Sequence, residues 1–127
     1  MFCSCGRRVQ LFKFLKESLG DSCKIIATDV QSIAPALYAA DEHYLTPRID
    51  APNYVDTILK IAIDNDVKAI TTLIDPEIEL LAKNRDLFEE YGIIVLAPSK
   101  ETAAYCFDKY KMFCYLKKNN IRTVLTY

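Results

Sequence analysis

Residues 1–28, MFCSCGRRVQLFKFLKESLGDSCKIIAT, contain the pattern that decides the fold of this chain. The apolar run at residues 1–5 predicts a strand, and Gly6 permits a tight turn after it. Apolar side chains recur at helical spacing within residues 7–19, and a glycine then ends the helix. A second apolar run occupies residues 24–28. Strand, helix and strand in this order predict two parallel strands joined by a right-handed crossover.

The remainder of the chain continues this alternation. Three further apolar runs, each predicted as a strand, lie at residues 42–46, 67–74 and 93–96. A helical turn is expected at residues 35–40 and a long helix at residues 75–91. The strands are continuous apolar runs, as expected when both faces of a sheet are buried. We therefore predict an α/β fold with a mostly parallel, five-stranded sheet covered on both faces.

Helix starts are marked by capping residues. Asn53 and Asp108 precede predicted helices, and Pro98-Ser99 opens another one. Asp75-Pro76-Glu77 combines a capping carboxylate, a proline at the first helical position and a second acid near the positive end of the helix dipole.

The composition bounds the possible functions. The chain has 127 residues, 51% of them hydrophobic and 26% charged, with a formal net charge of −1. This length predicts one domain with a real core, and the small charge gives no bulk attraction to nucleic acid or membranes. No apolar run has the length of a membrane span, and the N-terminus lacks a signal-peptide pattern. We expect a cytoplasmic protein without nucleic-acid or membrane partners.

The cysteines favour the same compartment. There are five, an odd number without regular spacing, and several lie inside apolar runs. This favours reduced thiols that act as small core residues over a disulfide framework. Cys3 and Cys5 stand too close together for paired zinc ligands, and His43 is the only histidine. We therefore expect no metal site.

Three polar segments are predicted to meet at one edge of the sheet. Ligands of open α/β sheets bind outside the carboxyl ends of the strands. Residues 4–8 (SCGRR), 29–32 (DVQS) and 75–77 (DPE) each follow a predicted strand. This edge is therefore the predicted ligand site.

The segment Gly6-Arg7-Arg8 is the strongest candidate at this edge. A helix N-terminus offers free N–H groups to an anion, and arginine adds bidentate donors for phosphate or carboxylate. Arginine is unfavourable at this end of a helix dipole, which favours a role beyond helix stability. The alternative is that both arginines are solvated or paired with acids; we favour a ligand role for one of them, which the sequence does not single out.

Asp29 and Glu77 are the acidic candidates. Asp29 stands where a ribose-binding acid would lie, but only Gly6 follows the first strand and no G-x-G-x-x-G pattern is present. NAD binding, and with it a minimal nucleotide-dependent oxidoreductase, is therefore disfavoured. Helix capping explains Asp75, whereas Glu77, one turn into the helix, can point toward the strand ends.

Four segments together resemble the N-terminal, pre-ATP-grasp domain of ATP-grasp ligases, above all the carbamoyl-phosphate-synthase-like members. They are SCGRRVQL (4–11), ATDVQSIAPALYAADEHYLTPRID (27–50), LIDPEIELLAKN (73–84) and FDKYKMFCYLKKNNI (107–121). The resemblance implies a Rossmann-like, three-layer α/β/α pre-ATP-grasp domain at residues 1–107. Residues 108–127 would then be a connecting helix and the start of an ATP-grasp domain.

The resemblance also implies a function. ATP-grasp enzymes phosphorylate a carboxylate with MgATP and join the acyl phosphate to an amine or other nucleophile. This domain would bind the substrate, a small carboxylate or other anion, through Gly6, Arg7, Arg8, Asp29 and Glu77. Lys109 aligns with an arginine that touches ATP in carbamoyl-phosphate synthase, and lysine keeps the charge without the planar fork. The alternative is a free-standing small-molecule binding or regulatory module without catalysis.

The C-terminal region carries three expectations. The lysines that bind ATP and the acids that bind magnesium belong to the ATP-grasp domain, so this chain is not expected to catalyse ligation by itself. Residues 121–127 should form no central strand of the sheet. Met112, Tyr115 and Leu116 should expose an apolar surface that the ATP-grasp domain covers, or through which the isolated chain forms a symmetric homodimer.

Overall fold

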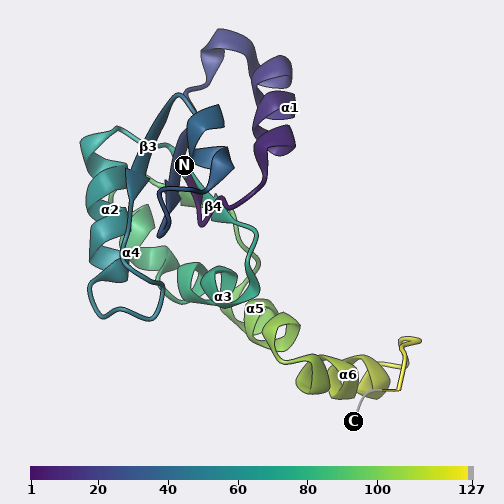
Figure 1. The fold of residues 1–127 in the computed structure, drawn as a ribbon. Coiled ribbons are helices and arrows are strands. Elements are labelled where there is room, and N and C mark those ends of the chain that lie inside the picture. The colour runs from purple at the N-terminus through teal and green to yellow at the C-terminus, as the bar shows by residue number, and fades with distance from the viewer. Residues whose placement is uncertain (126–127) are drawn as a thin grey trace.

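The computed structural model describes residues 1–125, except the side chain of Asp21, and shows one sheet with helices on both faces (Figure 1). The strands are β1 (Phe2–Cys3), β2 (Ile26–Asp29), β3 (Glu42–Leu45), β4 (Ala69–Thr72) and β5 (Ile94–Val95). The helices are α1 (Val9–Leu19), α2 (Tyr54–Asp64), α3 (Asp75–Lys83), α4 (Arg85–Glu89), α5 (Lys100–Phe107) and α6 (Lys109–Lys118). Two short 3₁₀ turns, η1 (Gly20–Ser22) and η2 (Pro35–Ala39), complete the described part of the chain.

The first strand lies at the centre of the sheet. The strand order is β3-β2-β1-β4-β5, and all four pairings are parallel. Phe2 pairs with Ala27 on one side and with Thr71 on the other. The predicted α/β class with a parallel five-stranded sheet is therefore confirmed. All carboxyl ends of the strands lie at one edge, where the candidate residues were predicted.

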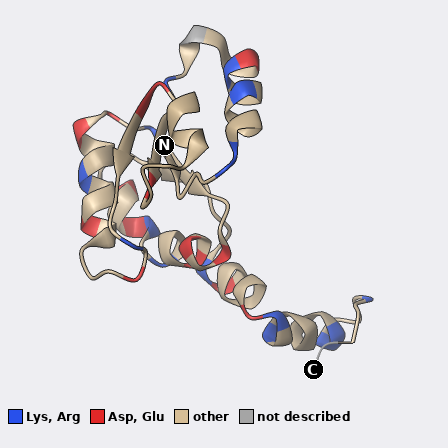
Figure 2. Ribbon diagram, in the orientation of Figure 1, with Lys and Arg blue, Asp and Glu red and all other residues tan. Residues whose placement is uncertain are grey.

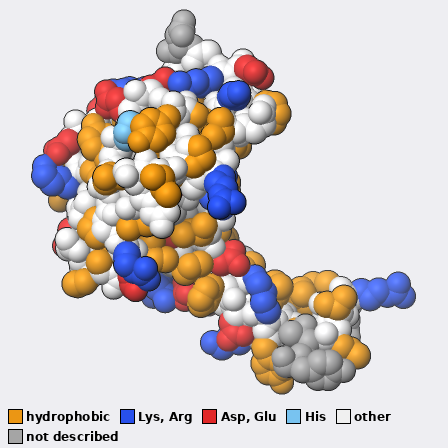
Figure 3. All heavy atoms as spheres, viewed as in Figure 1, with side chains coloured by type: hydrophobic (Ala, Val, Ile, Leu, Met, Phe, Trp, Pro, Cys, Tyr) orange, Lys and Arg blue, Asp and Glu red, His pale blue; other side chains and the backbone are white. Residues whose placement is uncertain are grey.

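The C-terminal helix α6 extends away from the rest of the molecule (Figures 1 and 3). Only Asp108, in an extended conformation, separates it from α5, and none of its residues is buried. Residues 109–127 contain five basic and no acidic side chains, and Figure 2 shows the basic ones at both ends of α6. We call residues 109–125 the arm. Residues 121–125 form no strand, as predicted, and residues 126–127 lie outside the described residues.

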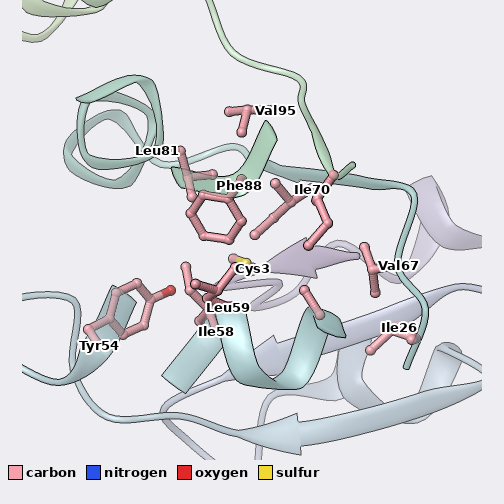
Figure 4. Close-up of a cluster of buried hydrophobic side chains, with 12 residues drawn as sticks. Cys3, Ile26, Tyr54, Ile58, Leu59, Val67, Ile70, Leu81, Phe88 and Val95 are labelled. Atoms are coloured by element: carbon pink, nitrogen blue, oxygen red, sulfur yellow. The ribbon is translucent and has the colours of Figure 1, made fainter. Parts of the chain in front are cut away.

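Two hydrophobic clusters fix the helices to the sheet. The larger one, on the face of α2, α3 and α4, is shown in Figure 4 and includes Cys3, Ile58, Ile70, Leu81 and Phe88. The smaller one, on the face of α1 and η2, centres on the fully buried Phe12 and Leu37. The layer on this second face is incomplete, because Ile94 and Leu96, on and just after β5, are more than half exposed.

The predicted helix over residues 75–91 divides in two at Asn84. The Asn84 side chain donates to the carbonyl oxygen of Leu80 at 2.8 Å, and its N–H reaches the carbonyls of both Leu80 and Leu81 at 3.2 Å. An asparagine side chain that binds the preceding turn competes with the regular helix. α3 therefore ends at Lys83, and α4 starts a new direction.

Two of the four predicted helix caps, Ser99 and Asp108, are confirmed. Ser99 accepts from the N–H of Thr102 at 3.2 Å, and Asp108 accepts from the first two N–H groups that follow Lys109. Asn53 stands at the N-cap of α2 but makes no capping bond with its side chain. Ile74, not Asp75, is the N-cap of α3, so Asp75 lies inside the helix and is free to pair elsewhere.

The five cysteines are free thiols, but only Cys3 and Cys5 belong to the core. Cys23, Cys106 and Cys114 are exposed, so the expectation of small core residues holds for two of the five. No group of metal-ligating side chains occurs within residues 1–125. None of the helices that these residues form is long and apolar enough to cross a membrane.

Candidate functional site

The turn after β1 adopts an unusual backbone. Ser4 has a φ of +45° and Gly6 a φ of +55°, so two of the three residues 4–6 lie in the left-handed region. Glycine adopts this region without cost, whereas serine is strained there. The turn therefore needs support from its surroundings. Strained backbone held in this way is a common property of binding sites.

Arg8 supplies much of this support. Its Nη1 donates to the carbonyl oxygens of Ser4 at 3.3 Å and Cys5 at 3.4 Å, and its Nη2 donates to the carbonyl of Leu73 at 3.2 Å. Leu73 follows β4, so one guanidinium connects the ends of two neighbouring strands. Arg8 therefore stabilises this turn. We expect the stability of the fold to depend on Arg8 more than on an ordinary surface arginine.

Asp29 supports the same turn from the other side. Its carboxylate accepts the N–H of Gly6 at 2.8 Å and the N–H of Gln31 at 3.0 Å, and the Cys5 thiol approaches it at 3.9 Å. Burial and the Asp29 charge raise the pKa of the Cys5 thiol to about 11, so the thiol stays protonated and can donate. The Asp29 side chain is buried, and its oxygens are already occupied by the protein.

Arg7 differs from its neighbour. Its side chain is exposed, and it makes no hydrogen bond or ion pair with any residue in the range 1–125. The two arginines therefore differ in their contacts, and their role in ligand binding stays a prediction. Of the two adjacent arginines, Arg8 holds the turn, and Arg7 remains available to a ligand.

Some of the backbone N–H groups predicted to be free at this turn are occupied. The N–H groups of Cys5, Gly6, Arg8 and Val9 donate within the chain, to Thr28, Asp29, Cys5 and Arg7 respectively. The N–H groups of Arg7, Gln10 and Leu11 have no acceptor within residues 1–125. An anion at this edge can therefore contact these N–H groups as well as the Arg7 side chain.

Glu77 lies beneath the turn with no exposed surface. Tyr54 Oη, from α2, donates to Glu77 Oε1, and Thr72 Oγ1, from the end of β4, donates to Glu77 Oε2. Tyr54 itself is almost fully buried and lies at the edge of the cluster in Figure 4. Glu77 thus joins α3 to α2 and to the end of β4.

The buried position changes the acidity of Glu77. Burial raises the pKa of its carboxyl to about 7, and the charge of Asp29 adds to the rise. The nearby Ser4 hydroxyl and the charge of Arg8 act in the opposite direction and lower this pKa. The carboxyl therefore changes protonation near neutral pH, directly below the turn after β1.

Lys109 contacts the same region from the arm. Its Nζ donates to Asp75 Oδ2 at 3.2 Å and to the carbonyl oxygen of Cys106 at 2.6 Å. Asp75 is the first residue of α3, two positions before Glu77. Both members of the ion pair are more than half exposed, so the pair contributes little to stability and can exchange readily.

A shallow pocket of about 220 Å³ lies next to this turn, at the ends of β1, β2 and β3. Ser4, Asp29, Thr46 and Arg48 line it together with apolar groups from Val30 and Ile49. Arg48 is exposed and paired with Asp50 at 3.0 Å. The edge of the sheet thus combines a small pocket, a stabilised turn and two exposed guanidinium groups, of which only that of Arg7 is unpaired within residues 1–125. This arrangement can bind a small anion, but within residues 1–125 it presents no nucleophile next to a general base.

Tyr54 and Thr72 are site residues that the sequence did not reveal, and Ser4 was predicted only as part of the polar segment 4–8. Tyr54 follows the predicted cap Asn53 and reads as an ordinary position of α2. Thr72 reads as one more residue of a strand, and Ser4 as part of the turn. None carries a local motif, because their role comes from contacts with residues that are distant in the sequence.

Comparison with known proteins agrees with this architecture. Residues 1–96 match the family model described as PylC-like, N-terminal domain. The fold is similar to a crystal structure of the biotin carboxylase subunit of pyruvate carboxylase, with a TM-score of 0.67 and 22% sequence identity over 98% of this chain. The present chain covers 28% of that protein. No curated protein sequence matches. The chain therefore belongs to the PylC-like N-terminal domain family and is, as its motifs predicted, a pre-ATP-grasp domain of the ATP-grasp ligases.

Proposed function

We propose that this domain forms the substrate-binding wall of an ATP-grasp carboxylate–amine ligase of the carbamoyl-phosphate-synthase-like kind, active in the cytoplasm. The substrate is a small carboxylate or a related anion. The exposed Arg7, which has no partner within residues 1–125 and stands on a braced turn at the ligand-binding edge, is the observation that carries this proposal. A guanidinium binds a carboxylate or phosphate with two parallel hydrogen bonds.

The other candidate residues then have different duties. Gly6, Arg8 and Asp29 hold the turn that presents Arg7, since their polar groups already bond to one another or to the strand ends. Glu77, without exposed surface, acts from below the turn through its bonds with Tyr54 and with Thr72 at the end of β4. These four are positioning residues, and only Arg7 is proposed to touch the ligand.

ATP and magnesium would be bound by the ATP-grasp domain of the parent enzyme, which supplies phosphoryl transfer to the substrate carboxylate. Lys109 is proposed to contact an ATP phosphate. Its present partner, Asp75, holds it through an exposed ion pair, and a phosphate carries more charge than one carboxylate. Without the ATP-grasp domain, the chain is not expected to catalyse ligation.

The arm is proposed to pack against that domain. Of the residues predicted to form this surface, Tyr115 is about half exposed, and Met112 and Leu116 are partly buried. Tyr110 is also about half exposed, and the Tyr115 ring lies 4.7 Å from the ring of Tyr105. When the ATP-grasp domain is absent, the same aromatic surface is available to a second copy, which would give the homodimer expected through the C-terminal region.

The proposal can be tested by nuclear magnetic resonance titration of the chain with inorganic phosphate and with succinate. We expect amide shifts at residues 4–8 and weak, millimolar binding, because the pocket has one wall and is open to water. Arg7→Ala should abolish these shifts, while Lys13→Ala, an exposed cation on α1, should leave them unchanged. In the full-length enzyme, Arg7→Ala should also reduce substrate-dependent ADP release.

Two results would contradict the proposal. Equal shifts in the Arg7→Ala and wild-type chains would show that Arg7 is ordinary surface charge. Micromolar binding by the chain alone would favour the alternative, a free-standing binding module, because a single wet wall does not support such affinity.

A further inference from the structure

The strand β3 forms an open edge of the sheet. Within residues 1–125 it pairs with β2 alone. The N–H groups of Glu42 and Thr46 point to β2, where they donate to Ile25 at 3.3 Å and Asp29 at 3.0 Å. Because backbone groups alternate along a strand, the N–H and C=O groups of His43 and Leu45 point to the open side. Such an edge is a template for pairing with another strand.

An apolar surface adjoins this edge. Residues 30–40, VQSIAPALYAA, contain no charged side chain. Ile33 is 82% exposed, Tyr38 67% and Leu45 55%, which is unusual for such large apolar groups in one short region. We call the surface formed by Val30, Ile33, Tyr38, His43 and Leu45 the β3 face.

The members of the β3 face are connected to one another. The Tyr38 ring lies 5.2 Å from the His43 ring, and its hydroxyl donates to the carbonyl oxygen of Ser32 at 2.7 Å. At the other end, Leu45 is in register with Asp29, next to Val30. Figure 3 views this side of the molecule, with hydrophobic side chains beside the pale blue histidine. Tyr38 and His43 therefore lie together at one end of the β3 face, and Leu45 and Val30 lie near its other end.

We propose that the β3 face binds a second copy of this chain, with the two β3 strands pairing antiparallel about a two-fold axis at Tyr44. Identical strands that pair antiparallel are self-complementary by symmetry. His43 then lies opposite Leu45 of the second copy, and the outward N–H and C=O groups of these two residues exchange two hydrogen bonds on each side of the axis.

The charges permit this pairing. Glu42, the only charged residue of β3, lies opposite Thr46 of the second copy and is already paired with Lys24 at 2.6 Å. The uncharged residues 30–40 meet their own copies without repulsion. The β3 face has five residues per copy, fewer than the roughly 20–30 residues per side of a standard interface. The dimer is therefore weak, with a dissociation constant on the order of micromolar.

The test separates this surface from the arm. Sedimentation equilibrium of the 127-residue chain is measured with Tyr115→Lys in all samples, which removes association through the aromatic arm surface. We expect a monomer–dimer equilibrium that Ile33→Lys weakens at least tenfold. His43→Pro, which removes an outward N–H while leaving the bonds to β2, should weaken it similarly. Phe14→Lys, at an exposed apolar position on α1, is the matched control and should dimerise normally.

Every other outcome overturns the proposal. A Tyr115→Lys chain that stays monomeric at near-millimolar concentration shows that the β3 face does not associate. Dimerisation that survives both Ile33→Lys and His43→Pro assigns the contact to another surface. Growth beyond the dimer excludes the closed two-fold arrangement. Thermal unfolding of each variant identifies any loss of association that follows from a loss of fold, and Ile33→Lys, on a side chain that is mostly in water, should unfold like the parent.

Discussion

Replacement of Glu77 by glutamine should make the chain more stable at alkaline pH and leave it nearly unchanged at acid pH. Glutamine has the shape of the protonated carboxyl and keeps one acceptor and gains one donor for the hydroxyls of Tyr54 and Thr72. What it removes is the charge. In the wild-type chain that charge has to be accommodated in a position without exposed surface.

The size of this stability difference follows from the pKa of Glu77. Burial raises the pKa of Glu77 from 4.5 to about 7, so the folded chain holds this proton more tightly than the unfolded chain. The stabilisation by the proton is complete below pH 4.5, is lost as the pH rises through the interval up to 7, and is constant above it. At about 1.4 kcal/mol per pKa unit, the loss between pH 5 and pH 8 is roughly 2–3 kcal/mol.

The measurement is chemical denaturation of the wild-type chain and the Glu77→Gln variant between pH 5 and pH 8. The difference between the two unfolding free energies cancels the carboxylates that titrate alike in both. It should grow by roughly 2–3 kcal/mol in favour of the variant between pH 5 and pH 8. Glu90→Gln, at an exposed position at the end of α4, is the control and should follow the wild type. Parallel curves for wild type and Glu77→Gln would refute the buried, proton-linked position of Glu77.

Three further changes test the turn after β1 and the joint to the arm. Arg8→Ala should lower the free energy of unfolding by about 1–2 kcal/mol, because three carbonyl oxygens lose a donor, while Arg7→Ala should stay within about 0.5 kcal/mol; equal effects in denaturation would remove the distinction between them. Gly6→Ala should cost about 1 kcal/mol through its left-handed φ and not through a clash, since the nearest atom to an added Cβ is Arg8 Nη1 at 3.5 Å; unchanged stability would contradict this. Asp108→Ala should speed hydrogen exchange in the first turn of α6 by an amount equivalent to about 1 kcal/mol and leave the sheet amides unchanged; a global effect would mean that the arm is part of the cooperative unit.

The order of the elements could be predicted from the sequence, whereas their lengths could not. Apolar runs that alternate with helical patterns indicate a parallel sheet without further information. β1 nevertheless ends at Cys3, because Ser4 turns into the left-handed region, and nothing local announces this in a serine. The division of the helix at Asn84 is similar, since it depends on the rotamer of one side chain.

The contacts of the candidate site were harder to predict from the sequence than the order of the elements. The sequence placed Arg7 and Arg8 together as equivalent candidates, and the fold separates them because it brings the carbonyl oxygen of Leu73 to Arg8. The sequence also placed Glu77 at the ligand edge. In the structure the Glu77 carboxyl is buried and accepts a hydrogen bond from Tyr54, 23 positions earlier in the chain. Polar partners so distant in sequence leave no periodic pattern from which their contact can be read.

The central position of β1 has a consequence for the order in which the protein is made. The ribosome releases the middle strand first, and each later strand adds to an outer side, β2 and β3 on one flank and then β4 and β5 on the other. The first flank and the small cluster around Phe12 can assemble once about 45 residues have emerged. The second flank follows several seconds later at ordinary translation rates. During that interval the far side of β1, which later pairs with β4, is the exposed edge of the nascent chain, so this stretch is where a chaperone would be of most use.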